Sequence, residues 1–305
     1  MTSSVLPEPL GEGSGWPWDV LPKHPEPGGP DPGTWPRITL VTPSYNQAAF
    51  LERTLRSVLA QDYPNLDYRV YDGGSTDGSV EILRHYAHLL GHWESAPDHG
   101  QSHAINKGLR EATGEILGWL NSDDAHLAGT LHTVARHLGD PHGPGALVGA
   151  ARVVGDREPV LMRGRYVDRD RLLQWWRPYE IHQPAVFWRR EVMERVGYLD
   201  EDEHFAMDYD LWLRIATESG FVTIPDVLAE MTSHPDAKTA DGFRRYRTGQ
   251  ARISRRYWGS PATARFWRLA GSRWTHLRVR PRLRRLRTLL IRTIRRDGSP
   301  RQSVG

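Results

Sequence analysis

The sequence has no cysteine. Disulfide bonds, thiolate nucleophiles, zinc fingers and iron–sulfur clusters are therefore excluded, and any bound metal must be held by oxygen or imidazole ligands. The sequence also has no run of roughly 18 apolar residues and no charged amino terminus followed by an apolar segment. We therefore expect neither a membrane-spanning helix nor a secretory signal, and these absences favour a cytoplasmic protein.

The 305 residues that are present have the composition of a globular enzyme, with 38% apolar, 25% charged and 10% aromatic residues. At roughly 150 residues per domain, the chain has room for two domains, or for one large α/β domain with appendages. Its charge is unevenly divided. Residues 241–305 contain 19 arginines, no lysine and two acids, a net charge of +17, whereas residues 1–240 carry a net charge of −14. Such asymmetry is typical of a chain with a polyanionic partner, either nucleic acid or an anionic membrane surface.

The chain divides into three segments by composition. Residues 1–36 contain nine prolines and six glycines without apolar periodicity, so we interpret them as a flexible arm. Local packing of its three tryptophans on the domain is the alternative. Residues 37–240 form a predicted α/β domain. Residues 241–305 form a predicted Arg-rich helical extension.

The extension contains an amphipathic pattern. Residues 282–297 read RLRRLRTLLIRTIRRD, in which apolar residues recur on one helical face among arginines, and three tryptophans lie upstream. The apolar residues are Leu283, Leu286, Leu290 and Ile294, and the tryptophans are Trp258, Trp267 and Trp274. This pattern favours a helix that lies in the interface of an anionic membrane. Packing against the acidic body and binding of nucleic acid are the alternatives.

Residues 37–240 alternate short apolar strands with amphipathic helices. Strands are predicted over residues 38–41, 68–71 and 115–120, and each is followed by a polar loop and then a helical pattern. Such alternation predicts a mostly parallel sheet covered by helices, and open sheets of this kind bind ligands at the carboxyl ends of their strands. No G-x-G-x-x-G motif follows the first strand, which argues against a dinucleotide-dependent oxidoreductase.

The loops after these strands read TPSYN, DGGSTDGS and NSDD. Asp123 and Asp124 of the third loop repel each other unless a cation compensates their charge. They indicate either a Mg²⁺ or Mn²⁺ site for a diphosphate or, alternatively, a cap for the following helix. Asp72 of the second loop either binds a ligand or organises its own Gly-Gly turn, and Tyr45 of the first either stacks on a base or packs.

The segment MDYDLWLR, residues 207–214, places two more acids near the start of a predicted helix. Arg214 can pair with Asp210 one turn away, which leaves Asp208 as the freer carboxylate. Asp208 is therefore a candidate general base, with helix capping as the alternative. His234, in MTSHPDAKT, is either a metal ligand or an ordinary histidine.

Together these motifs resemble those of the family 2 glycosyltransferases, which are inverting enzymes of the GT-A fold, from about Arg37 to His234. The segments that carry the resemblance occur in the family's order: ITLVTPSYNQAAFLERTLRSVLAQDYPN, DGGSTDGS, DHGQSHAINKGLREATGEILGWLNSDD, HQPAVFWRREVMERVGYLDE and MDYDLWLR. The resemblance implies an α/β fold of the GT-A type, with a Rossmann-like, mostly parallel mixed sheet flanked by helices.

The resemblance also implies which residues bind the donor and the metal. The donor-binding positions are Thr42, Pro43, Tyr45, Asp72, Gln101, Asn121 and Asp123, of which Pro43, Tyr45 and Asp72 are expected to contact the nucleoside. NSDD stands where the family has its metal-binding DXD motif, with Asn121 in place of the first aspartate. A Mn²⁺ or Mg²⁺ ion is then expected at Asp123, Asp124 and His234.

Catalysis is implied by the same comparison of motifs. MDYDLWLR resembles the family's ED motif with methionine at the first position, so the matching catalytic base is Asp208, and Gln183 is expected on the acceptor side. Ile105 stands where many members have an arginine that touches the diphosphate or the base, so that contact lacks its usual residue.

The implied reaction moves a sugar from a nucleotide-sugar donor, with a UDP-sugar favoured, to an acceptor hydroxyl. The acceptor class is a glycan, a lipid-linked glycan or a natural product, as in polysaccharide biosynthesis. The competing hypothesis is a non-catalytic α/β domain whose basic tail binds nucleic acid or a membrane.

Overall fold

The computed structural model describes residues 6–19, 35–166, 168–177, 180–235, 237–261 and 264–276. The chain forms two compact units. Unit 1 comprises residues 1–169 and 180–250, and unit 2 comprises residues 170–179 and 251–305. Within the described ranges, every helix is too short or too polar to cross a lipid bilayer.

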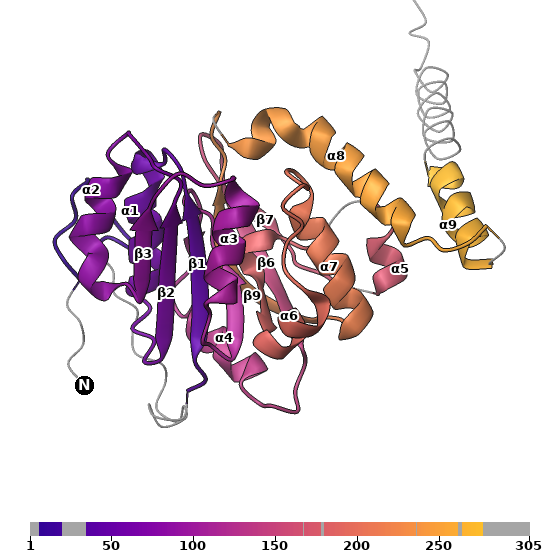
Figure 1. Ribbon diagram of the computed structural model, residues 1–305, viewed down its shortest axis with the longest axis horizontal. Helices are drawn as coiled ribbons and strands as arrows, with labels where there is room; N and C mark the ends of the chain where they lie inside the picture. Colours follow the sequence, from indigo (N-terminus) through magenta and orange to yellow (C-terminus); the bar gives the residue numbers. More distant parts are fainter. Residues whose placement is uncertain are drawn as a thin grey trace, which may run out of the picture. The chain divides into compact units, whose positions relative to one another are not determined.

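The first half of unit 1 alternates strands and helices, as the sequence predicts (Figure 1). Its elements are β1 (Ile38–Ser44), α1 (Ala48–Leu59), β2 (Leu66–Asp72), α2 (Ser79–Tyr86), the 3₁₀ helix η2 (Ala87–Leu89), β3 (His92–Ser95), α3 (Gln101–Arg110) and β4 (Ile116–Trp119). β3, β2, β1 and β4 lie side by side in that order and are parallel. The expected parallel arrangement is therefore confirmed for this half of the sheet.

The second half makes the sheet mixed. Its elements are β5 (Ala125–His126), α4 (Thr130–Leu138), β6 (Ala146–Val154), β7 (Val160–Met162), α5 (Arg169–Leu172), η3 (Gln183–Ala185), β8 (Val186–Arg189), α6 (Arg190–Val196), α7 (Met207–Glu218), β9 (Val222–Thr232), α8 (Lys238–Arg256) and α9 (Ala264–Trp274). The strand order is β3-β2-β1-β4-β8-β6-β9-β5, and β7 pairs with β6. β8 is antiparallel to both β4 and β6, whereas β9 is parallel to β6.

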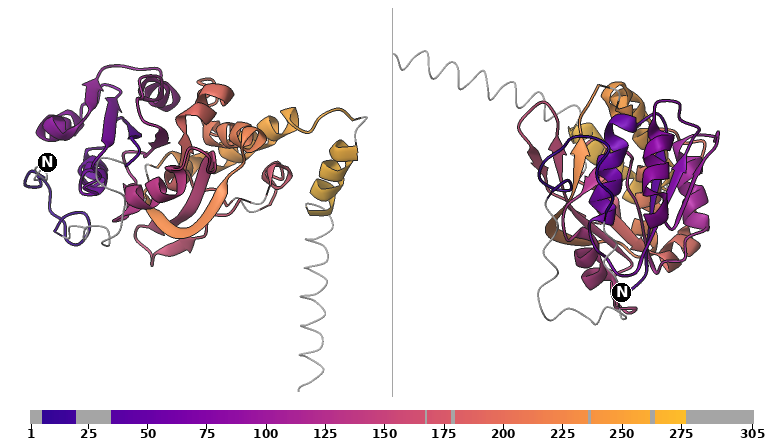
Figure 2. Two further views of the ribbon diagram at one scale, coloured as in Figure 1. Left: turned by 90° about the horizontal axis from the view of Figure 1, so that it is seen from below. Right: turned by 90° about the vertical axis from the view of Figure 1, so that its left-hand side faces the viewer.

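Helices cover both faces of the parallel strands (Figure 2). All seven residues of β1 are buried, and Leu40 packs in one core cluster with Leu51 and Leu55 of α1. The next residue, Val41, faces the opposite side because side chains alternate along a strand. There α3 approaches closely at Gly108, where a Cβ atom would lie 2.6 Å from Cγ1 of Val41.

Part of the N-terminal segment is bound to the body of unit 1. Two charged side chains of α1 hold this segment. Glu52 accepts hydrogen bonds from the backbone N–H groups of Leu10 and Gly11. Arg56 donates hydrogen bonds to the carbonyl oxygens of Pro7 and Trp18. The local docking that the tryptophans allowed is seen at Trp16, whose indole donates to the His126 carbonyl, and at Trp35, which is buried. Residues 20–34 lie outside the described ranges.

Candidate active site

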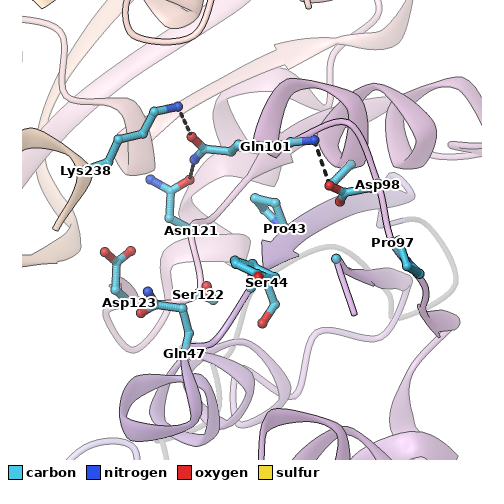
Figure 3. A pocket seen from close by; sticks show the side chains of 14 residues that line it. Pro43, Ser44, Gln47, Pro97, Asp98, Gln101, Asn121, Ser122, Asp123 and Lys238 are labelled. Carbon is cyan, nitrogen blue, oxygen red and sulfur yellow. Dashed lines mark hydrogen bonds between the residues drawn. The ribbon is translucent and has the colours of Figure 1, made fainter. Parts of the chain in front are cut away.

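A cavity of about 650 Å³ opens where β1 and β4 end, a size suited to a small-molecule ligand (Figure 3). Its lining residues come from the loops that follow the strands and from the starts of α3 and α8. They are Pro43, Ser44, Tyr45, Gln47, Gly73, Pro97, Asp98, Gly100, Gln101, Ala104, Asn121, Ser122, Asp123 and Lys238. The structure thus places Pro43, Tyr45, Gln101, Asn121 and Asp123, five of the predicted donor-binding residues, around one cavity.

The loop after β1 forms one wall. Tyr45 is 62% exposed, so it stands at the rim rather than packing into the core. Asn46, in the left-handed region at φ 50°, exchanges hydrogen bonds with the loop after β2: its N–H donates to Ser75 Oγ, and its Oδ1 accepts from the Thr76 N–H. Thr42 lies behind this wall, where its hydroxyl shares a hydrogen bond with Tyr68, and it does not line the cavity.

Asp72 organises its own loop. Its buried carboxylate accepts hydrogen bonds from the backbone N–H groups of Gly74 and Ser75 and from the hydroxyls of Ser75 and Ser95. Its neighbour Gly73 lines the cavity, whereas Asp72 does not. The turn-forming alternative therefore describes the observed contacts of Asp72, and its carboxylate supports the loop that reaches the ligand space.

A chain of side-chain hydrogen bonds links three residues that line the cavity (Figure 3). Lys238 Nζ donates to Gln101 Oε1 over 2.9 Å, and Gln101 Nε2 donates to Asn121 Oδ1 over 2.8 Å. The two amides are thereby fixed in orientation, because each of these atoms has a defined partner. Asn121, which stands in place of the usual aspartate, uses its carbonyl oxygen here.

Lys238 is the one cationic side chain among the described lining residues, and the sequence analysis did not single it out. Desolvation lowers the pKa of its ammonium group, and the carboxylate of Asp208 opposes this shift. A signal was present in the composition. The chain has only three lysines, at positions 23, 107 and 238, among 40 basic residues. Because lysine and arginine are not interchangeable, a rare lysine in an arginine-rich chain was a reason to examine these three positions.

Asp123 and His234 form a pair at the edge of the cavity. His234 Nε2 lies 3.1 Å from Asp123 Oδ2, and its ring packs on Phe50 with a centroid distance of 4.3 Å. Asp124 points elsewhere, because its Oδ1 accepts a hydrogen bond from the Thr232 N–H of β9. Burial, and then the charge of Asp123, raise the pKa of Asp124 well above its usual range. Asp124 is therefore a buried support of the acidic loop and does not line the cavity.

These residues suit a hard divalent cation with few protein ligands. Within the described ranges, no three histidine, aspartate or glutamate side chains converge as a ready-made metal cage. Asp123 and His234 still supply one carboxylate and one imidazole, and Mg²⁺ or Mn²⁺ commonly completes such a set with water and diphosphate oxygens. His234 Nδ1 is buried without a hydrogen-bond partner among the described residues, and Nε2 is the nitrogen that contacts Asp123.

Asp208 lies in the first turn of α7 and is half-buried. Its Oδ1 accepts from the Tyr209 N–H, and its Oδ2 lies 3.4 Å from the Tyr246 hydroxyl, which donates to it. Burial raises the pKa of Asp208 to about 6, although these hydrogen bonds and the charge of Lys238 act in the opposite direction. Asp208 is not part of the cavity lining, and its link to the cavity is the electrostatic interaction with Lys238.

The other acid of this helix has the structural role that its spacing indicated. Arg214 Nε donates to Asp210 Oδ2 over 2.9 Å, and its remaining nitrogens donate to the backbone carbonyls of Val196, Gly197 and Tyr198 after α6. Asp210 thus anchors an arginine that joins α7 to the end of α6.

Gln183 does not line the cavity and forms a hydrogen bond with the backbone instead. Its Nε2 donates to the carbonyl of Trp119, the last residue of β4, over 2.7 Å. Trp119 in turn stacks on Trp212 of α7, with ring centroids 5.4 Å apart and planes 11° from parallel. This contact fixes α7, and with it Asp208, against the strand that leads to Asn121.

The fold is an α/β fold with a cavity at the carboxyl ends of the strands, which is where open sheets of this kind bind ligands. A model of the family described as Glycosyl transferase family 2 matches residues 39–197, just over half of the chain. An uncharacterized glycosyltransferase of Mycobacterium tuberculosis is 32% identical over 240 residues, which cover 73% of this chain and 90% of that protein. A PGL/p-HBAD biosynthesis glycosyltransferase of the same organism is 32% identical over 200 residues, which cover 62% of this chain and 73% of that protein.

Two solved structures are similar as well. The mannosyltransferase PcManGT from Pyrobaculum calidifontis, in complex with GDP-Man and Mn²⁺, is 27% identical with a TM-score of 0.59, and the match covers 86% of this chain and 73% of that chain. TarS from S. aureus is 20% identical with a TM-score of 0.55, and the match covers 66% of this chain and 37% of TarS, a likeness of fold alone. The chain belongs to glycosyl transferase family 2. It is a glycosyltransferase with a GT-A-like fold.

Proposed function

We propose that this protein transfers a sugar from a nucleotide-sugar donor to an acceptor hydroxyl with inversion at the anomeric carbon. The observation that carries the proposal is the cavity at the strand ends, whose lining includes Lys238 and Asp123, with His234 bonded to Asp123. A diphosphate brings negative charge that needs a cation, and a cavity with one ammonium group and one carboxylate–imidazole pair suits it.

The donor would occupy the length of the cavity. We place its nucleoside near Pro43, Tyr45 and Gly73, because the exposed ring of Tyr45 offers a stacking surface at the rim. The diphosphate would lie near Lys238 and Asp123. The family resemblance favours a UDP-sugar, and the mannosyltransferase with the similar fold was solved with GDP-Man, so both nucleotides belong in the first test.

Asp123 and His234 are the residues that we expect to hold Mn²⁺ or Mg²⁺. When bound, the ion would supply positive charge that stabilises the leaving diphosphate. Asp124 was a third predicted ligand, and we assign it instead to holding the acidic loop against β9 through the Thr232 N–H. Lys238 adds a charge that the protein itself provides, whereas Ile105, which stands where many family members have an arginine, is buried and does not line the cavity.

Asp208 is the proposed general base. With a pKa of about 6, its carboxylate is mostly ionised at neutral pH and is more basic than an ordinary aspartate. The acceptor hydroxyl gives its proton to Asp208 as its oxygen bonds to the anomeric carbon, and the bond from that carbon to the diphosphate oxygen breaks. The nucleoside diphosphate leaves, and attack from the opposite face inverts the configuration. The proposed acceptor that supplies the hydroxyl is a glycan, a lipid-linked glycan or a natural product. Gln183 is the residue that we expect on the acceptor side of the site.

The test is a panel of UDP- and GDP-sugars with Mn²⁺, in which thermal shift reports donor binding and nucleoside diphosphate release reports turnover. We expect one nucleotide series to raise the melting temperature and to release diphosphate, and Asp208→Asn to keep the thermal shift while losing the release. If no nucleotide sugar of either series stabilises the wild-type protein, the proposed function is wrong.

A further inference from the structure

Unit 2 has a small core of its own. α9 turns Phe266 and Leu269 inward, and they are 8% and 1% exposed. Trp258 is also buried at 5%, and Phe266 packs edge-on against it. Trp258 therefore belongs to the core of unit 2 and cannot act with Trp267 and Trp274, although the sequence grouped the three together.

The opposite face of α9 carries two large exposed indoles. Trp267 and Trp274 are 65% and 63% exposed, far more than the buried tryptophans of this chain. They are seven residues apart, which returns to the same side of a helix within about 20° and separates them by about 10 Å along its axis. We call the exposed residues Trp267, Arg268, Gly271 and Trp274 the tryptophan face of α9.

The tryptophan face is suited to an apolar surface with polar headgroups. The Trp267 indole N–H donates to the Pro261 carbonyl over 2.8 Å, so this ring can enter an apolar medium without burying an unpaired donor. Gly271 lies between the two rings, and a Cβ atom there would meet no atom within 4 Å. Aromatic rings with a satisfied polar end are typical of the boundary between lipid and water.

The unit that carries this face is strongly basic in sequence. Unit 2 contains 18 arginines, no lysine and two acids. Asp170 is the one acid among the described residues of unit 2, and both Arg265 and Arg268 pair with it. The remaining arginines give the unit a large positive charge that attracts an anionic surface.

We propose that the tryptophan face of α9 docks this protein on an anionic lipid bilayer, with Trp267 and Trp274 in the headgroup region and the positive charge of unit 2 attracting the anionic lipids. A lipid surface explains both the exposed tryptophans and the arginines, whereas a nucleic acid explains mainly the arginines. In the sequence, the apolar residues at 283, 286, 290 and 294 also recur with helical spacing among arginines, and a phosphate backbone would not bury such apolar side chains. The structure of that segment lies outside the described ranges.

The experiment measures binding of the full-length protein to vesicles by flotation, without nucleotide, so its outcome is independent of donor binding. Vesicles of phosphatidylcholine alone are compared with vesicles that also contain phosphatidylglycerol, at low and at high ionic strength. We expect the protein to float with the anionic vesicles only, less at high salt, and the variant Trp267→Ser/Trp274→Ser to partition about tenfold more weakly.

The matched control removes apolar side chains that are exposed elsewhere. Val160 and Leu161 of β7, in unit 1, are 54% and 50% exposed, and Val160→Ser/Leu161→Ser should float like the wild type. Equal flotation of the tryptophan variant and the wild type would overturn the proposal. So would salt-sensitive binding to single-stranded RNA without flotation, which would indicate a nucleic-acid surface instead.

A second measurement needs no variant. Lipids with brominated acyl chains quench tryptophan fluorescence when indoles reach the bilayer, so anionic brominated vesicles should quench part of the wild-type emission. Absence of quenching in a protein that floats would also contradict the proposal, because binding would then involve charge alone.

Discussion

Asp208 and Lys238 influence each other's protonation. The charge of Lys238 stabilises the carboxylate form of Asp208, and that carboxylate stabilises the ammonium form of Lys238. Burial acts against both charged forms. The proposed proton acceptor, Asp208, is therefore coupled electrostatically to Lys238 in the cavity lining. Substitution of either residue should change the pH dependence of sugar transfer.

Asp208→Asn should lower kcat by about 10² to 10⁴-fold and leave donor affinity nearly unchanged, because only proton removal is lost. In the wild type, kcat/KM should rise with pH through a kinetic pKa of about 6, since the base is protonated below that value and ionised above it. Initial-rate kinetics from pH 5 to 8 checks both effects. Near-normal transfer by the variant would assign the base to another residue.

Lys238→Gln should weaken binding of the nucleoside diphosphate by about tenfold to a hundredfold, the usual loss when a charge-assisted hydrogen bond is removed. It should also move the kinetic pKa of Asp208 above 6, because the stabilising positive charge is gone. Titration calorimetry and the pH profile are the measurements, and Lys238→Arg should restore part of both.

The matched control is Lys107→Gln, which removes the lysine of α3 that pairs with Glu94 outside the cavity lining. This variant should bind nucleotide like the wild type. If the two lysine variants bind equally well, Lys238 has no part in the diphosphate site.

The site residues were predicted unevenly, for physical reasons. The acids after the strands were recognisable because strand ends gather ligands, and Asp123 does line the cavity. A local sequence pattern does not determine in which direction a carboxylate points. Asp72 and Asp124 accept hydrogen bonds from backbone N–H groups, but in the sequence they could not be distinguished from Asp123. Lys238 follows the last strand at the start of α8, and only the long-range pairing of β9 brings it near the loop after β4.

At the scale of elements, apolar periodicity in the sequence predicted most of the strands and helices of the first half of unit 1. The strands β1, β2 and β4 and the helices between them follow from alternating apolar spacing, and all were predicted. β3 was missed because HWES has no apolar alternation and is only half-buried. The antiparallel β8 and the two-residue β5 were missed for another reason, since the strands that pair with them lie far away in the sequence, as in the pairs Val148–Val186 and Ala125–Glu230.

The packing of α3 on the sheet offers a prediction at this scale. Gly108→Ala should destabilise unit 1 by about 1–3 kcal/mol, because its Cβ would overlap Val41 and Tyr71 and force the helix outward. Gly271→Ala on α9 is the control, with open space at the same atom and a gain in helix propensity. Urea unfolding of both variants measures the difference. Equal stability would show that α3 shifts without cost.

At the scale of the whole molecule, the chain joins an acidic catalytic unit to a strongly basic unit. The charge difference can be calculated from composition, because net charge is a sum over residues and needs no knowledge of the fold. The limits of the units were less predictable. Unit 2 includes residues 170–179 from the middle of the chain, whose tryptophans Trp175 and Trp176 contact residues after 250 through Arg273 and Trp258.

The central claim is that Asp123 and its neighbours hold a divalent ion against a nucleoside diphosphate. Calorimetric titration of the preferred nucleoside diphosphate, with Mn²⁺ or with excess chelator, on the wild type and on Asp123→Ala tests it most directly. The wild type should bind at least about tenfold more weakly in chelator, and Asp123→Ala should bind weakly in both conditions, because both changes remove the same interaction. Equal affinity of the wild type with and without metal, matched by an unimpaired Asp123→Ala, would contradict the account.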